Sequence, residues 1–154
     1  MKRILKFILL FLLGIIILIQ FIPSNRPLNE PDPAYDFFAA YDVPADIEEM
    51  VRASCFDCHS QEVKYPWYAW VAPVSWLVSR YVRDGRSHLD YSKWNELEKK
   101  DKIKMAGEIG EEVEMGEMPM PIYIIMHSNA DLDQAKRERI MQWSEDLAEK
   151  IFEE

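Results

Sequence analysis

Hydrophobic residues are unevenly distributed along this chain, and their spacing predicts helices. A nearly unbroken apolar run, FILLFLLGIIILIQFI, covers residues 7–22, with Gln20 as its only polar residue. Further along, apolar residues recur every three or four positions, which is the period of one helix face. These segments are residues 43–55, 73–82, 90–116 and 131–152. No segment shows the strict alternation of a half-buried strand, so the pattern predicts an all-α fold.

The apolar run, extended by Ile4 and Leu5, approaches the ~20 residues that a helix needs to cross a hydrocarbon core of ~30 Å. Lys2 and Arg3 precede the extended run, and Lys6 lies within it. The next basic residue along the chain is Arg26. This asymmetry predicts a single-pass anchor at residues 1–22 in the cell membrane, with a cytoplasmic N-terminus and the remainder periplasmic or otherwise extracytoplasmic. A cleaved signal peptide fits less well, because LIQFIPSN lacks the small residues that a signal peptidase requires.

Four prolines within residues 23–36 end the predicted anchor helix. They predict a semi-rigid tether over residues 23–34 and a folded domain over residues 35–154. The chain has 18 Lys and Arg residues against 27 Asp and Glu residues, and three of the basic residues stand at the N-terminus. So acidic a domain repels nucleic acid, and it favours protein partners with a basic docking surface.

Both cysteines lie in the sequence Cys55-Phe56-Asp57-Cys58-His59, which is the CxxCH pattern at which c-type haem is attached. The spacing lets both thiols reach vinyl groups on one edge of a porphyrin. His59 then lies beneath the iron and supplies the proximal ligand. We therefore expect one covalent haem c, held by Cys55 and Cys58.

Three other interpretations of the two cysteines fit less well. A thioredoxin-like dithiol belongs in a βαβ context, and no strands are predicted. A zinc site needs four ligands, and after His59 only His88 and His127 follow, at irregular spacing. A plain disulfide leaves His59 without a role.

The segment CFDCHSQEVKYPWYAWVAPVSWLVSRYVRDGRSHLDYSKW and the later EVEMGEMPMPIYIIMHSNADL resemble the haem-binding domain family. Members of this family are membrane-anchored bacterial mono-haem c-type cytochromes. The matching elements are CxxCHS followed by KYPWY, then APVSWL, GEMP and a Tyr-x3-His pattern, within roughly residues 46–143. The resemblance implies a small cytochrome c-like helical domain around one haem.

The sixth ligand of the iron is expected from GEMPMPIYIIMH. Small cytochromes c take a methionine thioether from a Met-Pro loop before the C-terminal helix, and GEMP resembles the family segment, so the resemblance favours Met118. Met120, also followed by proline, and His127 are the alternatives. A thioether favours Fe(II) and raises the reduction potential, whereas a second imidazole lowers it. The haem crevice is expected to be lined by Trp67, Tyr68, Trp76 and Tyr123.

These features predict a one-electron carrier that exchanges electrons with redox proteins rather than an enzyme, because no substrate pocket or acid–base pair is visible. The alternative is a haem-based sensor or peroxidase-like enzyme, in which the sixth ligand is exchanged for a small molecule. In that case His127 supplies the polar group beside the iron.

Overall fold

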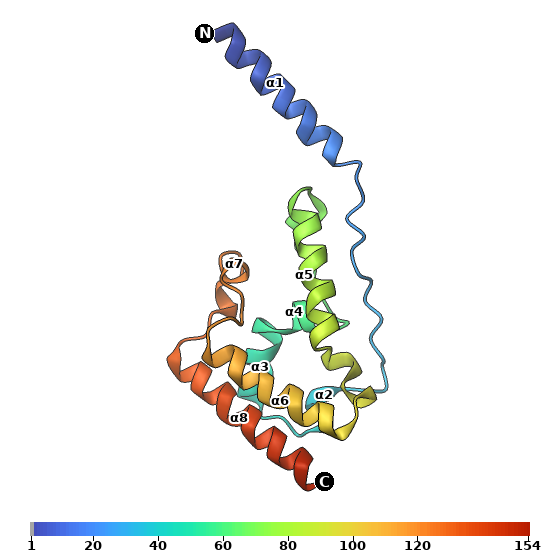
Figure 1. The fold of residues 1–154 in the computed structure, drawn as a ribbon, viewed down its shortest axis with the longest axis vertical. Coiled ribbons are helices and arrows are strands. Elements are labelled where there is room, and N and C mark those ends of the chain that lie inside the picture. Colours follow the sequence, from blue (N-terminus) through green and yellow to red (C-terminus); the bar gives the residue numbers. More distant parts are fainter. Residues whose placement is uncertain (1) are drawn as a thin grey trace.

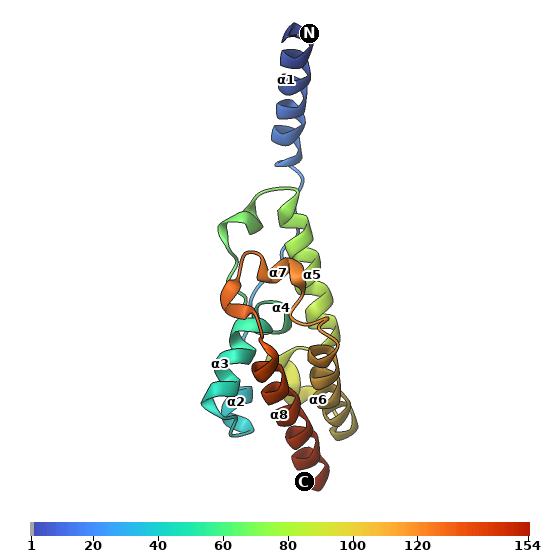
Figure 2. The same cartoon turned by 90° about the vertical axis from the view of Figure 1, so that its left-hand side faces the viewer.

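The computed structural model describes residues 2–154, and within that range the chain is helical and contains no β-strand. Figures 1 and 2 show α1 (Lys2–Ile19) at one end of the molecule and the C-terminus of α8 at the other. The remaining helices are α2 (Phe37–Ala40), α3 (Ala45–Ser54), α4 (Phe56–His59), α5 (Val74–His88), α6 (Lys99–Glu114), α7 (Pro121–Ile124) and α8 (Gln134–Glu153). Three 3₁₀ turns join them: η1 (Trp67–Trp70), η2 (Tyr91–Glu96) and η3 (Ser128–Ala130). The predicted all-helical content is confirmed.

The predicted membrane anchor at residues 1–22 is wrong. α1 has 18 residues and ends at Ile19, and Lys2, Arg3 and Lys6 are part of the helix. Its apolar part beyond Lys6 is about 20 Å long at 1.5 Å per residue, less than the ~30 Å of a hydrocarbon core. Within residues 2–154, no helix combines the length and the apolar character needed to cross a membrane. The predicted single-pass placement, with a cytoplasmic N-terminus and a periplasmic domain, loses its basis for the same reason.

The proline-rich segment after α1 is extended and runs along α5 (Figure 1). Arg83 of α5 donates a hydrogen bond to the Asn25 carbonyl at 2.9 Å, and Arg86 donates one to the Leu28 carbonyl at 2.7 Å. The Tyr65 hydroxyl donates to the Pro27 carbonyl at 2.8 Å. Prolines lack an amide hydrogen and favour this extended form, so side-chain donors from the helical domain bind the carbonyls that the segment leaves free.

The hydrophobic core lies at the end of the molecule where α6 and α8 run side by side (Figures 1 and 2). An aromatic cluster joins this pair to the smaller helices. The ring of Phe37 lies 4.9 Å from that of Tyr91 and 5.1 Å from that of Trp94, and all three are buried. The residues of α8 in the same core are Ile140, Trp143, Leu147 and Ile151. Burial of these rings fixes η2, and with it the residues that lead from α5 into the core.

Two glycines of α6 differ in what surrounds them, and this generates a matched test of the α6–α8 packing. A Cβ at Gly110 would collide with the Ser144 side chain of α8, whereas a Cβ at Gly107 would meet nothing within 4 Å. Gly110→Ala is expected to lower the free energy of unfolding by about 1–3 kcal/mol. Gly107→Ala is expected to raise it by up to ~1 kcal/mol, because alanine favours the helix. Urea unfolding followed by circular dichroism measures the free energy of unfolding of both variants. Equal effects of the two substitutions would contradict the close contact of Gly110 with α8.

Candidate functional site

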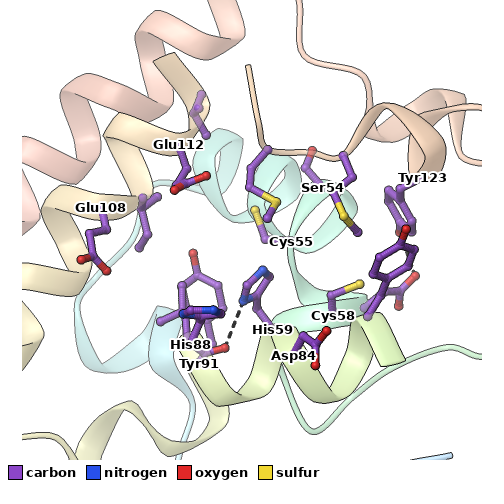
Figure 3. A pocket seen from close by; sticks show the side chains of 18 of the residues that line it. Ser54, Cys55, Cys58, His59, Asp84, His88, Tyr91, Glu108, Glu112 and Tyr123 are labelled. Carbon is purple, nitrogen blue, oxygen red and sulfur yellow. Dashed lines mark hydrogen bonds between the residues drawn. The ribbon is translucent and has the colours of Figure 1, made fainter. Parts of the chain in front are cut away.

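The CxxCH segment forms a single helical turn that continues directly from α3. The Cys58 and His59 amides both donate hydrogen bonds to the Cys55 carbonyl, at 3.1 and 2.9 Å. This turn presents the two thiols and the imidazole to the same cavity (Figure 3). The neighbouring Ser60 hydroxyl is buried and donates to the Phe56 carbonyl at 2.8 Å, which closes the end of the turn.

The cavity in front of this turn has a volume of about 370 Å³. Its walls come from α4, from α5 and η2, from α6 and from the segment that includes Met118, Met120 and Tyr123. A second cavity of about 330 Å³ adjoins it. Asp57, Cys58, Tyr81, Met120 and Tyr123 line both cavities. Each volume lies in the range of cofactor sites, and the shared lining makes the two cavities parts of one crevice.

His59 is held in one orientation by a backbone carbonyl. Its Nδ1 donates a hydrogen bond to the Leu89 carbonyl at 3.1 Å, just beyond the C-terminus of α5. Because Nδ1 carries the proton, Nε2 is left with a free lone pair, and it is the ring nitrogen on the cavity side in Figure 3. Burial lowers the pKa of His59, so the imidazole is neutral. A neutral imidazole whose other nitrogen is bonded to a carbonyl is the usual form of a metal-ligating histidine.

The two cysteines are free thiols in surroundings that disfavour the thiolate. No disulfide joins them. Burial raises the pKa of Cys55 to about 12 and that of Cys58 to about 11. Redox dithiols and zinc sites use thiolates, whose pKa is lowered by their surroundings. Within residues 2–154, moreover, no group of three or more His, Cys, Asp and Glu side chains is arranged to hold a metal ion.

The segment with Met118 is fixed at the end of α6 by contacts from two helices. The Met118 amide donates to the Glu112 carbonyl at 3.1 Å. Arg137 of α8 donates from one nitrogen to the Val113 carbonyl at 2.8 Å and to the Met118 carbonyl at 3.3 Å. Between them, Gly116 turns the chain with a φ of 74°, which favours glycine. Arg137 therefore binds both the last turn of α6 and the backbone of the methionine that follows it.

Tyr123 connects the methionine segment to the CxxCH turn. Its hydroxyl donates to the Asp57 carboxylate at 2.8 Å, and the other Asp57 oxygen accepts the Lys64 amide at 3.0 Å. Asp57 stands between the two cysteines in the sequence. One carboxylate thus holds together the CxxCH turn, the loop after it and α7.

His127 belongs to the part of the crevice formed by the second cavity. It lines only the second cavity, where its ring stacks on Tyr123 with a centroid distance of 4.0 Å. Its Nδ1 is 3.1 Å from the Tyr123 carbonyl, and its Nε2 is 3.3 Å from the Tyr68 hydroxyl. The structure therefore brings Met118 and Met120 to the His59 cavity, and it places His127 in contact with two tyrosines instead.

The predicted crevice aromatics divide between the two cavities. Trp67 and Tyr68 line the second cavity, and Tyr123 lines both. Trp76 lines neither of them, and its indole nitrogen donates to the Ile22 carbonyl at 3.3 Å.

The residues around the cavity fit a haem. Both thiols, a neutral imidazole with a free nitrogen and two thioethers meet there among largely apolar side chains. The wall also contains a buried hydroxyl, that of Tyr91, which has no hydrogen-bond partner within the protein.

A comparison with protein families supports this fit. The family model described as "Haem-binding domain" matches residues 14–146. The chain belongs to the haem-binding domain family. The resemblance seen in the sequence is confirmed, and the protein is a haem protein. Neither the curated proteins nor the solved structures contain a match to this chain.

Several residues around the His59 cavity could not be predicted from the sequence, because their position depends on distant contacts. Tyr81 and Tyr91 reach the wall from α5 and η2, and Asp57 and Arg137 act through the hydrogen bonds described above. The spacing of Tyr81 with Val74, Leu77 and Val78 was the one available signal, because it places Tyr81 on the apolar face of a helix.

Gly85 permits the close approach of α5 to the CxxCH turn, and its substitution tests that approach. A Cβ at position 85 would lie 2.5 Å from the Cys58 carbonyl oxygen and 3.1 Å from the Cys58 Cβ. Gly85→Ala is expected to push α5 away, to lower the free energy of unfolding by about 1–3 kcal/mol and to reduce the haem content. The ratio of haem to protein absorbance measures the second effect. Gly107→Ala is the control, and full haem content in Gly85→Ala would contradict the prediction.

Proposed function

We propose that this haem protein is a mono-haem c-type cytochrome that transfers single electrons between protein partners. The observation that carries the proposal is the His59 imidazole, which is bonded through Nδ1 to the Leu89 carbonyl. Its free nitrogen faces a cavity lined by both CxxCH thiols and by two Met-Pro methionines. A haem bound there supplies an iron that alternates between Fe(II) and Fe(III).

Cys55 and Cys58 provide the covalent attachment in this proposal. Each thiol adds across one vinyl group: a sulfur–carbon bond forms, and the thiol hydrogen passes to the other vinyl carbon. The addition has no leaving group and needs no oxidant. Both side chains belong to one helical turn and line one cavity, which supports attachment along a single porphyrin edge.

His59 is the proposed proximal ligand, and Met118 is the proposed sixth ligand. Both line the same cavity. Met118 is favoured over Met120 because both its amide and its carbonyl are hydrogen-bonded, to Glu112 and Arg137. The Met120 backbone is held through its carbonyl, which accepts from the Tyr123 and Ile124 amides. A restrained backbone lowers the entropy lost when a weak thioether ligand is held on a metal. A neutral thioether favours Fe(II), so the account implies a higher potential than two imidazoles would give.

The site suits electron transfer because both proposed iron ligands lie on backbone that neighbouring helices hold in place. His59 is held by the end of α5, and the Met118 backbone is held by α6 and α8. An iron with two fixed ligands changes oxidation state with little movement of the protein. Asp84, Glu108 and Glu112 line the cavity (Figure 3), and the chain has a net charge of −9. These charges favour redox partners with a basic surface, which would meet the protein near the haem.

Replacement of each methionine tests the sixth ligand. Met118→Ala is expected to abolish the iron–methionine charge-transfer band and to allow CO to bind, while the covalent haem stays in place. Met120→Ala is the matched control and is expected to keep the band. Absorption spectra of the oxidised and the CO-treated reduced proteins measure both. A band that survives in Met118→Ala and disappears in Met120→Ala would reassign the ligand, and survival in both would exclude either methionine.

Replacement of the cysteines tests covalent attachment. The double variant Cys55→Ser with Cys58→Ser is expected to release all its haem in denaturant, since no thioether remains. Each single variant is expected to retain haem through the other cysteine. Haem staining of a denaturing gel measures the retention. Haem that stayed with the double variant would contradict attachment through these two thiols.

A further inference from the structure

Residues 121–127, which follow the two candidate methionine ligands, lie at the surface of the fold. None of their side chains is buried, and Ile125 is 77% exposed. α7 lies within this stretch and has no buried residue. A segment with few buried apolar contacts gains little packing energy, and such segments open more readily than the core. Specific hydrogen bonds therefore determine where this segment lies.

The methionine segment, residues 118–123, is attached to the rest of the fold at its start. The Met118 amide donates to the Glu112 carbonyl at 3.1 Å. The Met118 carbonyl accepts from Arg137 at 3.3 Å, which is longer than the 2.8 Å between the same nitrogen and the Val113 carbonyl. The longer bond is the weaker of the two. A second attachment beyond Met118 therefore contributes to holding both methionines at the cavity.

Tyr123 makes that second attachment. Its amide donates to the Met120 carbonyl at 2.9 Å, so Tyr123 and Met120 belong to one turn. Its hydroxyl donates to the Asp57 carboxylate at 2.8 Å and lies 3.4 Å from the Ala53 carbonyl. Figure 3 shows Tyr123 on the Cys58 side of the cavity. Burial raises the pKa of Tyr123, so the phenol keeps its proton and acts as the donor.

Few other hydrogen bonds hold this part of the chain. In residues 2–154, those that join residues 119–127 to elements other than the adjoining η3 come from the Tyr123 hydroxyl and the His127 ring. The His127 contact with the Tyr68 hydroxyl is 3.3 Å long and lies beyond both methionines. The bond from Tyr123 to Asp57 is shorter, and its carboxylate acceptor makes it charge-assisted and stronger.

Asp57 connects this bond to the other side of the cavity. It stands between the two cysteines, in the turn that also carries His59. One hydrogen bond therefore ties the methionine segment to the turn that supplies the thiols and the imidazole. A thioether is a weak ligand, and the entropy it loses on the metal is smaller when its backbone is already held. Loss of this bond would favour release of the methionine.

We propose that Tyr123 is a positioning residue, whose hydroxyl holds the methionine segment over the iron through Asp57 and so slows exchange of the sixth ligand. The inference rests on the proposed function, because it needs a haem with a methionine ligand in this cavity. It assigns the Tyr123 hydroxyl a role that is separate from lining the crevice. It also implies that one hydrogen bond keeps the electron carrier closed to small molecules.

Exchange of the sixth ligand for CO in the reduced, haem-loaded full chain tests this proposal. Tyr123→Phe is expected to speed that exchange on the order of tenfold or more, because it removes a hydrogen bond to a charged group. Its reduction potential is expected to fall, since the thioether that favours Fe(II) is held less firmly. Stopped-flow absorption measures the rate, and a redox titration measures the potential.

Tyr65→Phe is the matched control. It removes a hydroxyl that donates at 2.8 Å to the Pro27 carbonyl, and Tyr65 lines neither cavity. Both variants are compared by urea unfolding as well. Tyr65→Phe is expected to keep the wild-type CO rate and potential. An equal rise of the CO rate in both variants would make the effect a general loss of stability, and would overturn the inference.

Asp57→Asn tests whether Tyr123 acts through this carboxylate. The amide oxygen still accepts a hydrogen bond, but the bond loses its charge assistance. Asp57→Asn is therefore expected to speed CO exchange less than Tyr123→Phe does. Added to Tyr123→Phe, it is expected to change the rate little, because the bond is already absent. An equal effect with and without Tyr123→Phe would show that the two residues act separately, and would overturn the inference.

The remaining outcomes separate this inference from the function on which it rests. A wild-type CO rate in Tyr123→Phe, with covalent low-spin haem, would overturn the role of Tyr123 and leave the cytochrome proposal standing. Prompt CO binding by the wild type, or absence of the iron–methionine band from it, would overturn the proposed ligation and the inference together.

Discussion

The close contact between α5 and the CxxCH turn is the constraint on which the rest of the site depends. It exists because residue 85 has no side chain, which lets the helix backbone approach the Cys58 carbonyl. The same helix then ends at the point where the Leu89 carbonyl meets His59 Nδ1. One packing contact thus sets both the position of the thiols and the direction of the imidazole.

The opposite wall of the cavity is built by long-range hydrogen bonds. Arg137 of α8 reaches the backbone at Val113 and Met118, and Tyr123 of α7 reaches Asp57 within the CxxCH turn. The packing of α6 on α8 therefore acts on the His59 cavity, because it sets where Arg137 lies. A change in that packing is transmitted to the Met118 backbone through a hydrogen-bonded side chain.

The all-helical content and the binding of haem were predictable because they depend on local patterns. Helical periodicity is repeated in each segment, and CxxCH places two thiols and an imidazole within one turn. The membrane anchor was predicted wrongly for a related reason: hydropathy counted apolar residues as far as Ile22, whereas the helix ends at Ile19 and includes three charged residues. The carbonyl of Leu89 and the contacts of Arg137 could not be predicted, since they join residues distant in the sequence. The unbonded state of the Tyr91 hydroxyl is likewise a property of the packed core.

The central claim is that one haem lies in this cavity with His59 and a methionine as axial ligands. Absorption spectra of the haem-loaded full chain, oxidised and reduced, with and without CO, test it most directly. The account predicts low-spin iron, the iron–methionine charge-transfer band in the oxidised protein, and a reduced spectrum that CO leaves unchanged. High-spin iron or prompt CO binding would contradict it, and would direct attention to a site that binds small molecules.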